Sequence, residues 1–213
     1  MKSFDDFLLE YADPHLRDAG FNVVGRRTYF LGAQNSIWVQ FRDQSAPGWI
    51  AFIGEWSVIP RASLDFFSSA YPDEAPNTLW GVLAGRIEVP AEKIHLAVVP
   101  ASPSSWSFEV PGRLSEGGST LSAVLTEHDI PWLTGLTSSD RLLNVFDKKE
   151  VRFGVPSHTP STWPARYVAL HIDDGDIATL QGMLSELREL GQYPEWVEWW
   201  SQRLDGRAPG SKT

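Results

Sequence analysis

The first sixty residues constrain the fold most, because they combine one amphipathic helix with three strands in quick succession. Ser3 is placed to cap the helix, and acidic residues follow it in the positively polarised first turn. The apolar residues that recur on one face of this helix are Phe4, Phe7, Leu8 and Tyr11. Strands are then predicted at 28–31, 36–42 and 49–58, with short turn-like stretches between them. Short connections join neighbouring antiparallel strands, so this region predicts an antiparallel sheet with a helix packed on it.

The rest of the chain changes from the period of strands to that of helices. Further strands are predicted at 79–89, 94–99 and 105–110. Helices are predicted at 61–71, 121–125, 133–136, 142–146, 177–190 and 194–204. Three stretches lack a clear period: 112–118 indicates a polar break, 155–164 a proline-rich linker, and 167–171 is ambiguous between strand and helix.

These patterns predict an α+β fold, in which an antiparallel β-sheet is packed by an N-terminal helix and a helical C-terminal third. A chain of 213 residues is long enough to bury a sizeable core as one domain. We expect residues 1–150 to form the α+β domain. Residues 151–213 are expected to be a linker and C-terminal helices that pack on the same body.

A set of dispersed apolar and glycine positions resembles a known family. They lie at 16–21 (LRDAGF), 27–29 (RTY), 37–41 (IWVQF) and 52–54 (FIG), and then at 85–87 (GRI), Trp106, 130–133 (IPWL) and Leu142. Over residues 4–147 the chain is similar to the DUF4304 family, although Pro47 and Gly48 form a turn where the family pattern has a basic-polar loop. The resemblance implies an α+β body with a curved antiparallel sheet, and it implies no activity.

The charge of the chain argues against several classes of function. The formal net charge is −9, and basic residues cluster no further than pairs such as Arg26 and Arg27, so nucleic-acid binding is disfavoured. The absence of cysteine excludes disulfides, thiolate catalysis and cysteine-based zinc sites. Acidic residues near the start and the lack of a long apolar run favour a cytoplasmic protein without a membrane segment.

Two polar segments carry residues suited to chemistry. The segment 171–176 (HIDDGD) has ligands for a divalent cation, but an aspartate that caps the helix starting near Ile177 is the favoured interpretation. The run 127–129 (EHD) is interpreted as a solvated helix end, because adjacent helical side chains point to different faces. Neither a nucleophile elbow nor a phosphate loop occurs in the sequence. We therefore expect no catalytic residue, no metal and no cofactor, and we favour a protein that is not an enzyme.

Aromatic and arginine side chains give the candidates for binding. Trp196, Trp199 and Trp200 share one helix face, which favours docking onto the protein's own core over a partner or self-association interface. Arg26, Arg27 and Arg86 would clamp an anion if the sheet brought them together, although edge charges that discourage aggregation are preferred. The candidate lining of a pocket between sheet and helices consists of Trp38, Trp56 and Trp80, with Arg27 and Arg86 at its mouth.

The favoured function is non-catalytic protein–protein binding. Its concrete version is an immunity-type protein that neutralises a toxin, since an acidic protein captures a basic partner quickly. The rival is a small-molecule-binding or enzymatic domain with the aromatic pocket. A self-associating structural protein, whose dimer would be lost on Trp199→Ala, is the third reading. The sequence leaves the partner, the ligand and the oligomeric state open.

Overall fold

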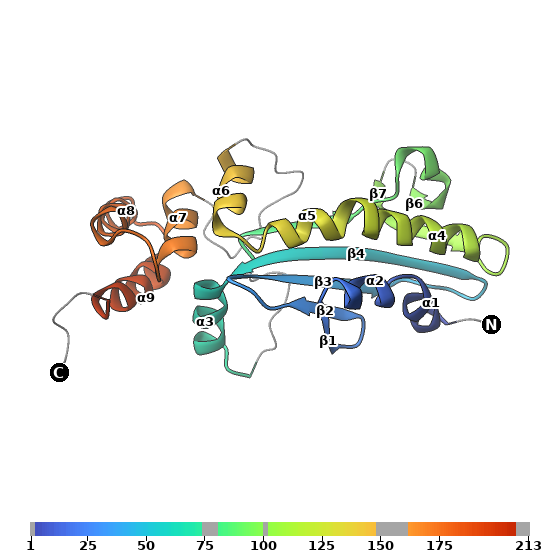
Figure 1. The fold of residues 1–213 in the computed structure, drawn as a ribbon, viewed down its shortest axis with the longest axis horizontal. Coiled ribbons are helices and arrows are strands. Elements are labelled where there is room, and N and C mark those ends of the chain that lie inside the picture. The colour runs from blue at the N-terminus through green and yellow to red at the C-terminus, as the bar shows by residue number, and fades with distance from the viewer. Residues whose placement is uncertain (1–2, 74–80, 100–101, 148–161, 208–213) are drawn as a thin grey trace.

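The protein is an elongated α+β fold with one antiparallel sheet, as the sequence predicts (Figure 1). The computed structural model describes residues 3–73, 81–99, 102–147 and 162–207. The strands are β1 Asn22–Gly25, β2 Thr28–Leu31, β3 Asn35–Asp43, β4 Trp49–Pro60, β5 Leu83–Ile87, β6 Ala97–Val99 and β7 Ser102–Glu109. Their order is β1-β2-β3-β4-β7-β6, and β5 pairs with the same side of β4 as β7, so β4 is the central strand of the sheet.

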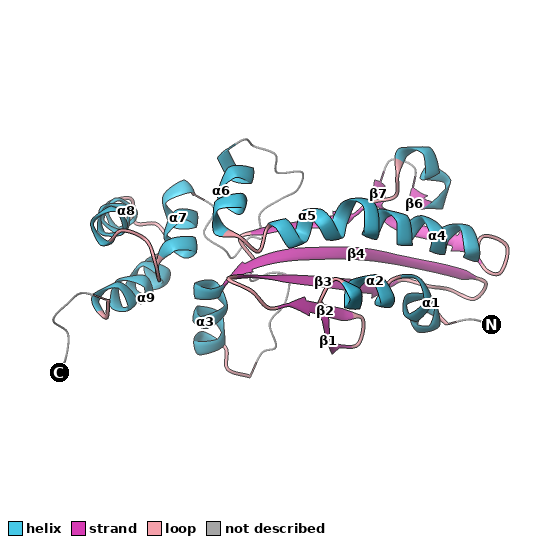
Figure 2. Cartoon of the chain, viewed as in Figure 1, coloured by secondary structure: helices cyan, strands magenta, loops and turns pink. Residues whose placement is uncertain are grey.

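Helices cover the sheet, and further helices extend the molecule beyond one end of the sheet (Figure 2). The α-helices are α1 Phe4–Tyr11, α2 Asp13–Asp18, α3 Arg61–Ala70, α4 Leu114–Val124, α5 Ile130–Gly135, α6 Ser139–Asp147, α7 Trp163–His171, α8 Ile177–Glu189 and α9 Pro194–Asp205. A 3-10 helix, η2 Ala91–Leu96, precedes β6, and a π-helical turn, η3 Leu125–Asp129, joins α4 to α5. The first helix starts at the predicted cap, because Ser3 and Asp6 form a reciprocal capping box.

The core lies between the sheet and the helices on one of its faces. Opposite residues of antiparallel strands share a face, so the pairs Ile50–Phe108 and Phe52–Trp106 point the same way. The ring of Phe7 from α1 lies 5.9 Å from that of Phe52 and 5.2 Å from that of Phe108. All five side chains are almost completely buried, so the first helix and the central strands are joined by aromatic packing.

The segments α4, η3 and α5 form one continuous helix along β4 (Figure 1). The predicted polar break at 112–118 is wrong, since α4 begins at Leu114 and includes two glycines. A Cβ atom on Gly117 would lie 2.7 Å from the Phe108 ring, and one on Gly118 would lie 2.5 Å from the Tyr11 ring. The glycines are therefore not helix breakers here, because they allow the helix to approach the sheet and α1 closely.

Several other local predictions differ from the structure. Strand β1 was missed, and the strand predicted at 94–99 is the end of η2 followed by the short β6. The strand predicted at 79–89 is only five residues long in the described part, while 79–80 lie outside the described residues. The ambiguous stretch at 167–171 is helical as part of α7, where Pro164 occupies the first turn. Most of the predicted linker, 155–161, lies outside the described residues.

The C-terminal helices pack on the body through α3. The rings of Phe66 on α3 and Trp196 on α9 stack with their centroids 3.8 Å apart. Arg203 on α9 also forms an ion pair with Asp65 on α3 at 2.9 Å. These contacts connect the last helices with the helix that directly follows the central strand.

Candidate functional site

A cleft of about 1400 Å³ runs beside the long helix, and we call it the groove. One wall is the polar side of α4, η3 and α5. The other consists of the end of β5 and the helix η2. The groove thus lies where the edge of the sheet meets the helical layer, which is a common position for a binding site.

Two contacts mark the ends of the groove. At one end Lys93 on η2 donates a hydrogen bond of 3.0 Å to Glu116 on α4. At the other end the rings of Trp56 on β4 and Trp132 on α5 meet edge to face with centroids 5.0 Å apart. Trp132 lies sixteen positions after Glu116, so at about 1.5 Å per residue the groove is about 24 Å long.

Acidic side chains outnumber basic ones in the groove. Among the described residues, five carboxylates line it, those of Glu88, Glu92, Glu116, Glu127 and Asp129, against three basic residues, Arg86, Lys93 and Arg141. Hydrogen bonds from Lys93 and His95 keep the pKa of Glu116 below its usual value. The groove therefore carries excess negative charge at neutral pH, which suits a cationic occupant.

The run 127–129 is not a helix end, because it belongs to the π-helical turn in the middle of the long helix, but Glu127 and His128 are exposed as predicted. Pro131, two residues further on, has no N–H to bond the carbonyl of Glu127, which removes one regular helical hydrogen bond at this turn. π-helical turns are often found at functional sites. Here the turn places Glu127, His128 and Asp129 in the wall of the groove.

The structure divides the predicted aromatic pocket. Trp38 is opposite Ser57, whereas Trp56 is opposite Val39, so the two tryptophan side chains point to opposite faces of the sheet. Trp38 packs against Phe30 on its own face. Trp80 lies outside the described residues. Of the predicted pocket residues with a described position, Trp56 and Arg86 line the groove, and Trp38 does not.

The arginine clamp, considered as the alternative to edge charges, does not form. Arg27 is fixed in the β1–β2 turn with a positive φ of 65° and pairs with Asp5 at 2.5 Å and Asp43 at 3.0 Å. Arg26 binds the same Asp5 carboxylate, and these bonds hold the pKa of Asp5 below its usual value. Arg86 instead lies 3.6 Å from Glu55 on β4. Three strand spacings, roughly 14 Å across the sheet, separate it from Arg27. Arg27 thus stabilises the fold and does not line the groove, and its role in binding stays a prediction.

The tryptophan cluster of the last helix is mostly internal. Trp200 is fully buried and Trp196 is 6% exposed, so they do not form the exposed interface that we considered as the alternative. Trp199 is half-buried, with its ring against Phe66 and under the guanidinium of Arg203. The favoured interpretation, docking onto the protein's own core, describes this packing.

The segment 171–176 contains the residue that caps α8 and two aspartates that contact basic side chains. Asp176 accepts a hydrogen bond of 2.8 Å from the Thr179 N–H and caps α8, as predicted. Asp173 binds Arg203 and Asp174 contacts His171. Within the described ranges, no three histidine or acidic side chains are grouped to hold a metal ion.

The sequence did not single out Glu116, Lys93 or Trp132 as binding residues. A signal for this wall existed, because Glu116, Thr120 and Glu127 recur at helical spacing and line the groove. It was hidden by the interpretation of the glycines at 117 and 118 as a break.

Comparison with known proteins adds no relative: no family model, no curated protein and no solved structure matches this chain. The resemblance to the DUF4304 family therefore stays a prediction. No helix in the described part of the chain is long and apolar enough to cross a membrane.

Proposed function

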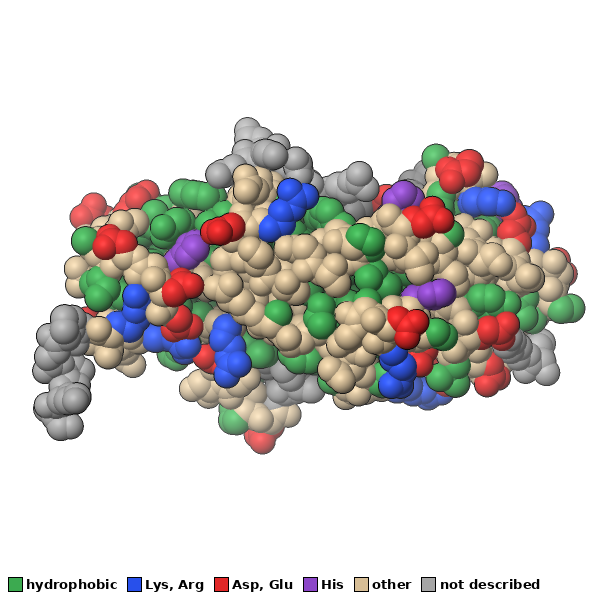
Figure 3. Space-filling model, in the orientation of Figure 1, with side chains coloured by type: hydrophobic (Ala, Val, Ile, Leu, Met, Phe, Trp, Pro, Cys, Tyr) green, Lys and Arg blue, Asp and Glu red, His purple; other side chains and the backbone are tan. Residues whose placement is uncertain are grey.

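We propose that this protein acts by binding, without catalysis, and that its groove accepts a basic segment of a protein partner. The observation that carries the proposal is the groove itself, in which the described part of the lining has five carboxylates and three basic residues beside a tryptophan pair. The surrounding surface mixes acidic and basic side chains over the face shown in Figure 3. The groove shares the acidic balance of the whole chain, which has 27 acidic and 18 basic residues, and it differs from the open surface in its concave shape and its tryptophan pair.

The size of the groove favours a peptide segment over a small metabolite. Its volume of about 1400 Å³ exceeds the range of roughly 300–1,000 Å³ that is usual for small-molecule sites. A length of about 24 Å corresponds to about seven residues of extended chain. A segment of this length would contact both the Glu116 end and the Trp132 end.

The negative charge of the groove favours a positively charged partner. A guanidinium or ammonium group would be attracted by the carboxylates and would stack favourably on the half-buried Trp132. The net charge of −9 would also speed the encounter with a basic protein. A toxin-neutralising, immunity-type protein is the narrower version of this proposal, in which the basic partner is a toxin.

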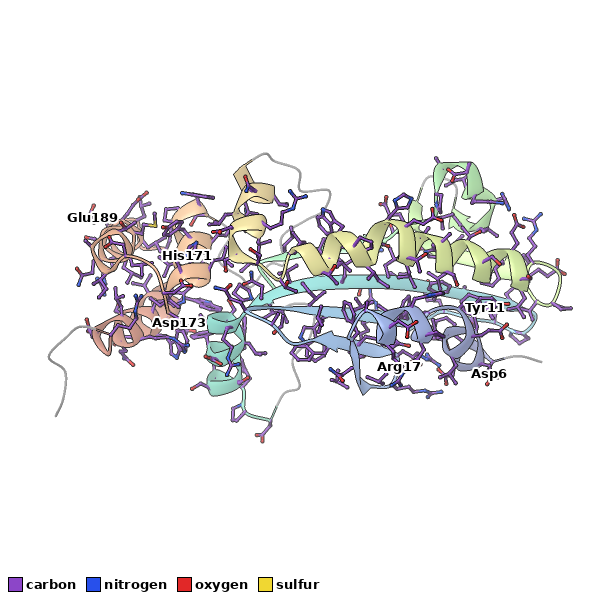
Figure 4. All side chains as sticks on the ribbon, in the orientation of Figure 1. Asp6, Tyr11, Arg17, His171, Asp173 and Glu189 are labelled. Atoms are coloured by element: carbon purple, nitrogen blue, oxygen red, sulfur yellow. The ribbon has the colours of Figure 1, made fainter. Side chains whose placement is uncertain are left out.

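The test is capture of a partner from the host's lysate at low and then moderate salt, with Glu127→Lys as the groove variant. Glu127 is exposed, so the charge reversal should leave the fold intact and reduce capture by about tenfold. The matched control is Glu189→Lys, on α8 at the opposite end of the molecule (Figure 4). A partner that both variants capture as well as the unchanged protein would overturn the proposal.

A second candidate rests on the Trp56–Trp132 pair and on Arg86, which lines the same groove. This end provides the aromatic surface that a small-molecule site would need, while the Arg86 side chain lies beside Glu55, on the sheet face opposite to that of Trp56. A metabolite that quenches tryptophan fluorescence in the unchanged protein, and not in Trp132→Phe, would support this candidate. A library that produces no such difference would eliminate it.

A further inference from the structure

The Glu116 end of the groove already holds cations that belong to the chain. Lys93 Nζ donates to Oε1 of Glu116 at 3.0 Å, and Nε2 of His95 lies 3.0 Å from the same oxygen. Both Lys93 and His95 come from η2, across the groove from α4. The three side chains are 36% to 41% exposed, so a solute can reach this contact.

We propose that Glu116 anchors an arginine side chain of the partner and that Lys93 is the resident competitor which this arginine displaces. The inference rests on the proposed function, since it names the group that the groove recognises. It makes Glu116 and Lys93 the residues that set affinity and specificity at this end.

The chemistry of the contact favours this exchange. An exposed ion pair like that of Lys93 and Glu116 changes an equilibrium constant by no more than about fivefold. Lys93 can therefore leave at a small cost and return to water. An ammonium group is a point charge, whereas a guanidinium can bond both oxygens of one carboxylate in parallel. Arginine should thus bind the anchor about five to ten times more tightly than lysine.

The experiment uses the full chain and a fluorescent heptapeptide with arginine at alternate positions, compared with matched lysine and glutamate peptides. Anisotropy gives the affinity, and the ¹⁵N indole signal of Trp132, assigned with Trp132→Phe, reports whether the peptide lies in the groove. Lys93→Met should tighten binding of the arginine peptide about twofold to fivefold. Glu116→Gln should weaken it about tenfold and remove the preference for arginine over lysine.

Matched controls separate the contact from general charge effects. Arg17→Met removes a cation from another exposed ion pair, with Asp13 on α2, and Glu189→Gln removes a distant carboxylate (Figure 4). Both should leave affinity unchanged. In the double variant, the gain from Lys93→Met should vanish, because Glu116→Gln has removed the group for which the two cations compete.

The outcomes distinguish this inference from the function on which it rests. Groove binding of the arginine peptide that is unchanged by both substitutions, or equal to that of the lysine peptide, would overturn the inference alone. A Trp132 signal that no peptide shifts would overturn the proposed function, and the inference with it.

Discussion

The groove and the helical end, which consists of α3, α7, α8 and α9, use the same kinds of side chain in opposite ways. At the helical end, Arg203 lies between Asp65 and Asp173, and the ring of Trp196 stacks on Phe66 and packs at an angle against Trp200. In the groove, five carboxylates share three basic side chains, and Trp132 stays half-buried. Closed aromatic packing and matched charges stabilise a fold, whereas exposed carboxylates such as Glu127 beside a half-buried ring are suited to binding.

The largest expected effect tests this contrast through two tryptophans. Trp200→Ala should lower the free energy of unfolding by about 3–5 kcal/mol, because it empties a fully buried site between the last helices and the core. Trp132→Ala should cost less, about 1–2 kcal/mol, since its ring is only partly buried. Denaturant unfolding of both variants measures the difference. Equal losses would mean that the groove wall is as much a part of the core as the helical end.

The next effect concerns the close approach of the long helix to α1. Gly118→Ala should destabilise the protein by about 1–3 kcal/mol, because the new Cβ would lie 2.5 Å from the ring of Tyr11. Gly182→Ala on α8 is the control, since nothing lies within 4 Å of its Cβ position. That variant should gain about 0.5–1 kcal/mol from helix propensity. Thermal melts that move in the same direction for both would contradict the close contact.

A smaller effect depends on pH and on Asp5. The bonds from Arg27 and Arg26 lower the pKa of Asp5 from its ordinary value of 3.8, so the folded state binds fewer protons than the unfolded state. The resulting stabilisation is present above pH 3.8 and is lost as the pH falls through the lower pKa of the folded state. Asp5→Asn should therefore be less stable than the unchanged protein at neutral pH. The free energies of unfolding of the two proteins, measured as a function of pH, should converge in acid. Parallel curves down to low pH would show that the ion pairs contribute nothing.

The smallest effect on stability is expected in the groove. Glu127→Lys should change the free energy of unfolding by less than about 0.5 kcal/mol, because Glu127 is exposed on the helix surface. The same substitution should weaken partner capture, so binding and stability would separate at this position. A clear loss of stability would show that Glu127 supports the π-helical turn.

The sequence predicted the parts of the fold that local patterns determine. Alternation located β3, an apolar run located β4, and the caps at Ser3 and Asp176 fixed two helix starts. Prediction from the sequence failed where tertiary contacts override local preference, as at Gly117 and Gly118. These glycines are needed because aromatic rings lie directly against them, and a local pattern does not indicate those rings. The register of β3 on β4 then decided which face each tryptophan occupies, and this could not be read from composition.

The groove itself could be predicted only in part. Trp56 and Arg86 were among the expected binding residues and do line it. Lys93 and Glu116 meet because η2 crosses beside α4, a consequence of the connection between β5 and β6 that no spacing in the sequence indicates. The sequence alone did not indicate which residues that are far apart in the chain lie side by side in the fold.

The π-helical turn between α4 and α5 also sets the rotational phase of the long helix. Each residue turns a helix by about 100°, so an extra residue in one turn offsets everything after it by that angle. Glu116 lies before η3 and Trp132 after it, and both line the same groove. Deleting one residue from 125–129 would restore a regular helix and turn its two halves out of alignment. The wall of the groove therefore depends on the length of this turn as much as on the identity of its side chains.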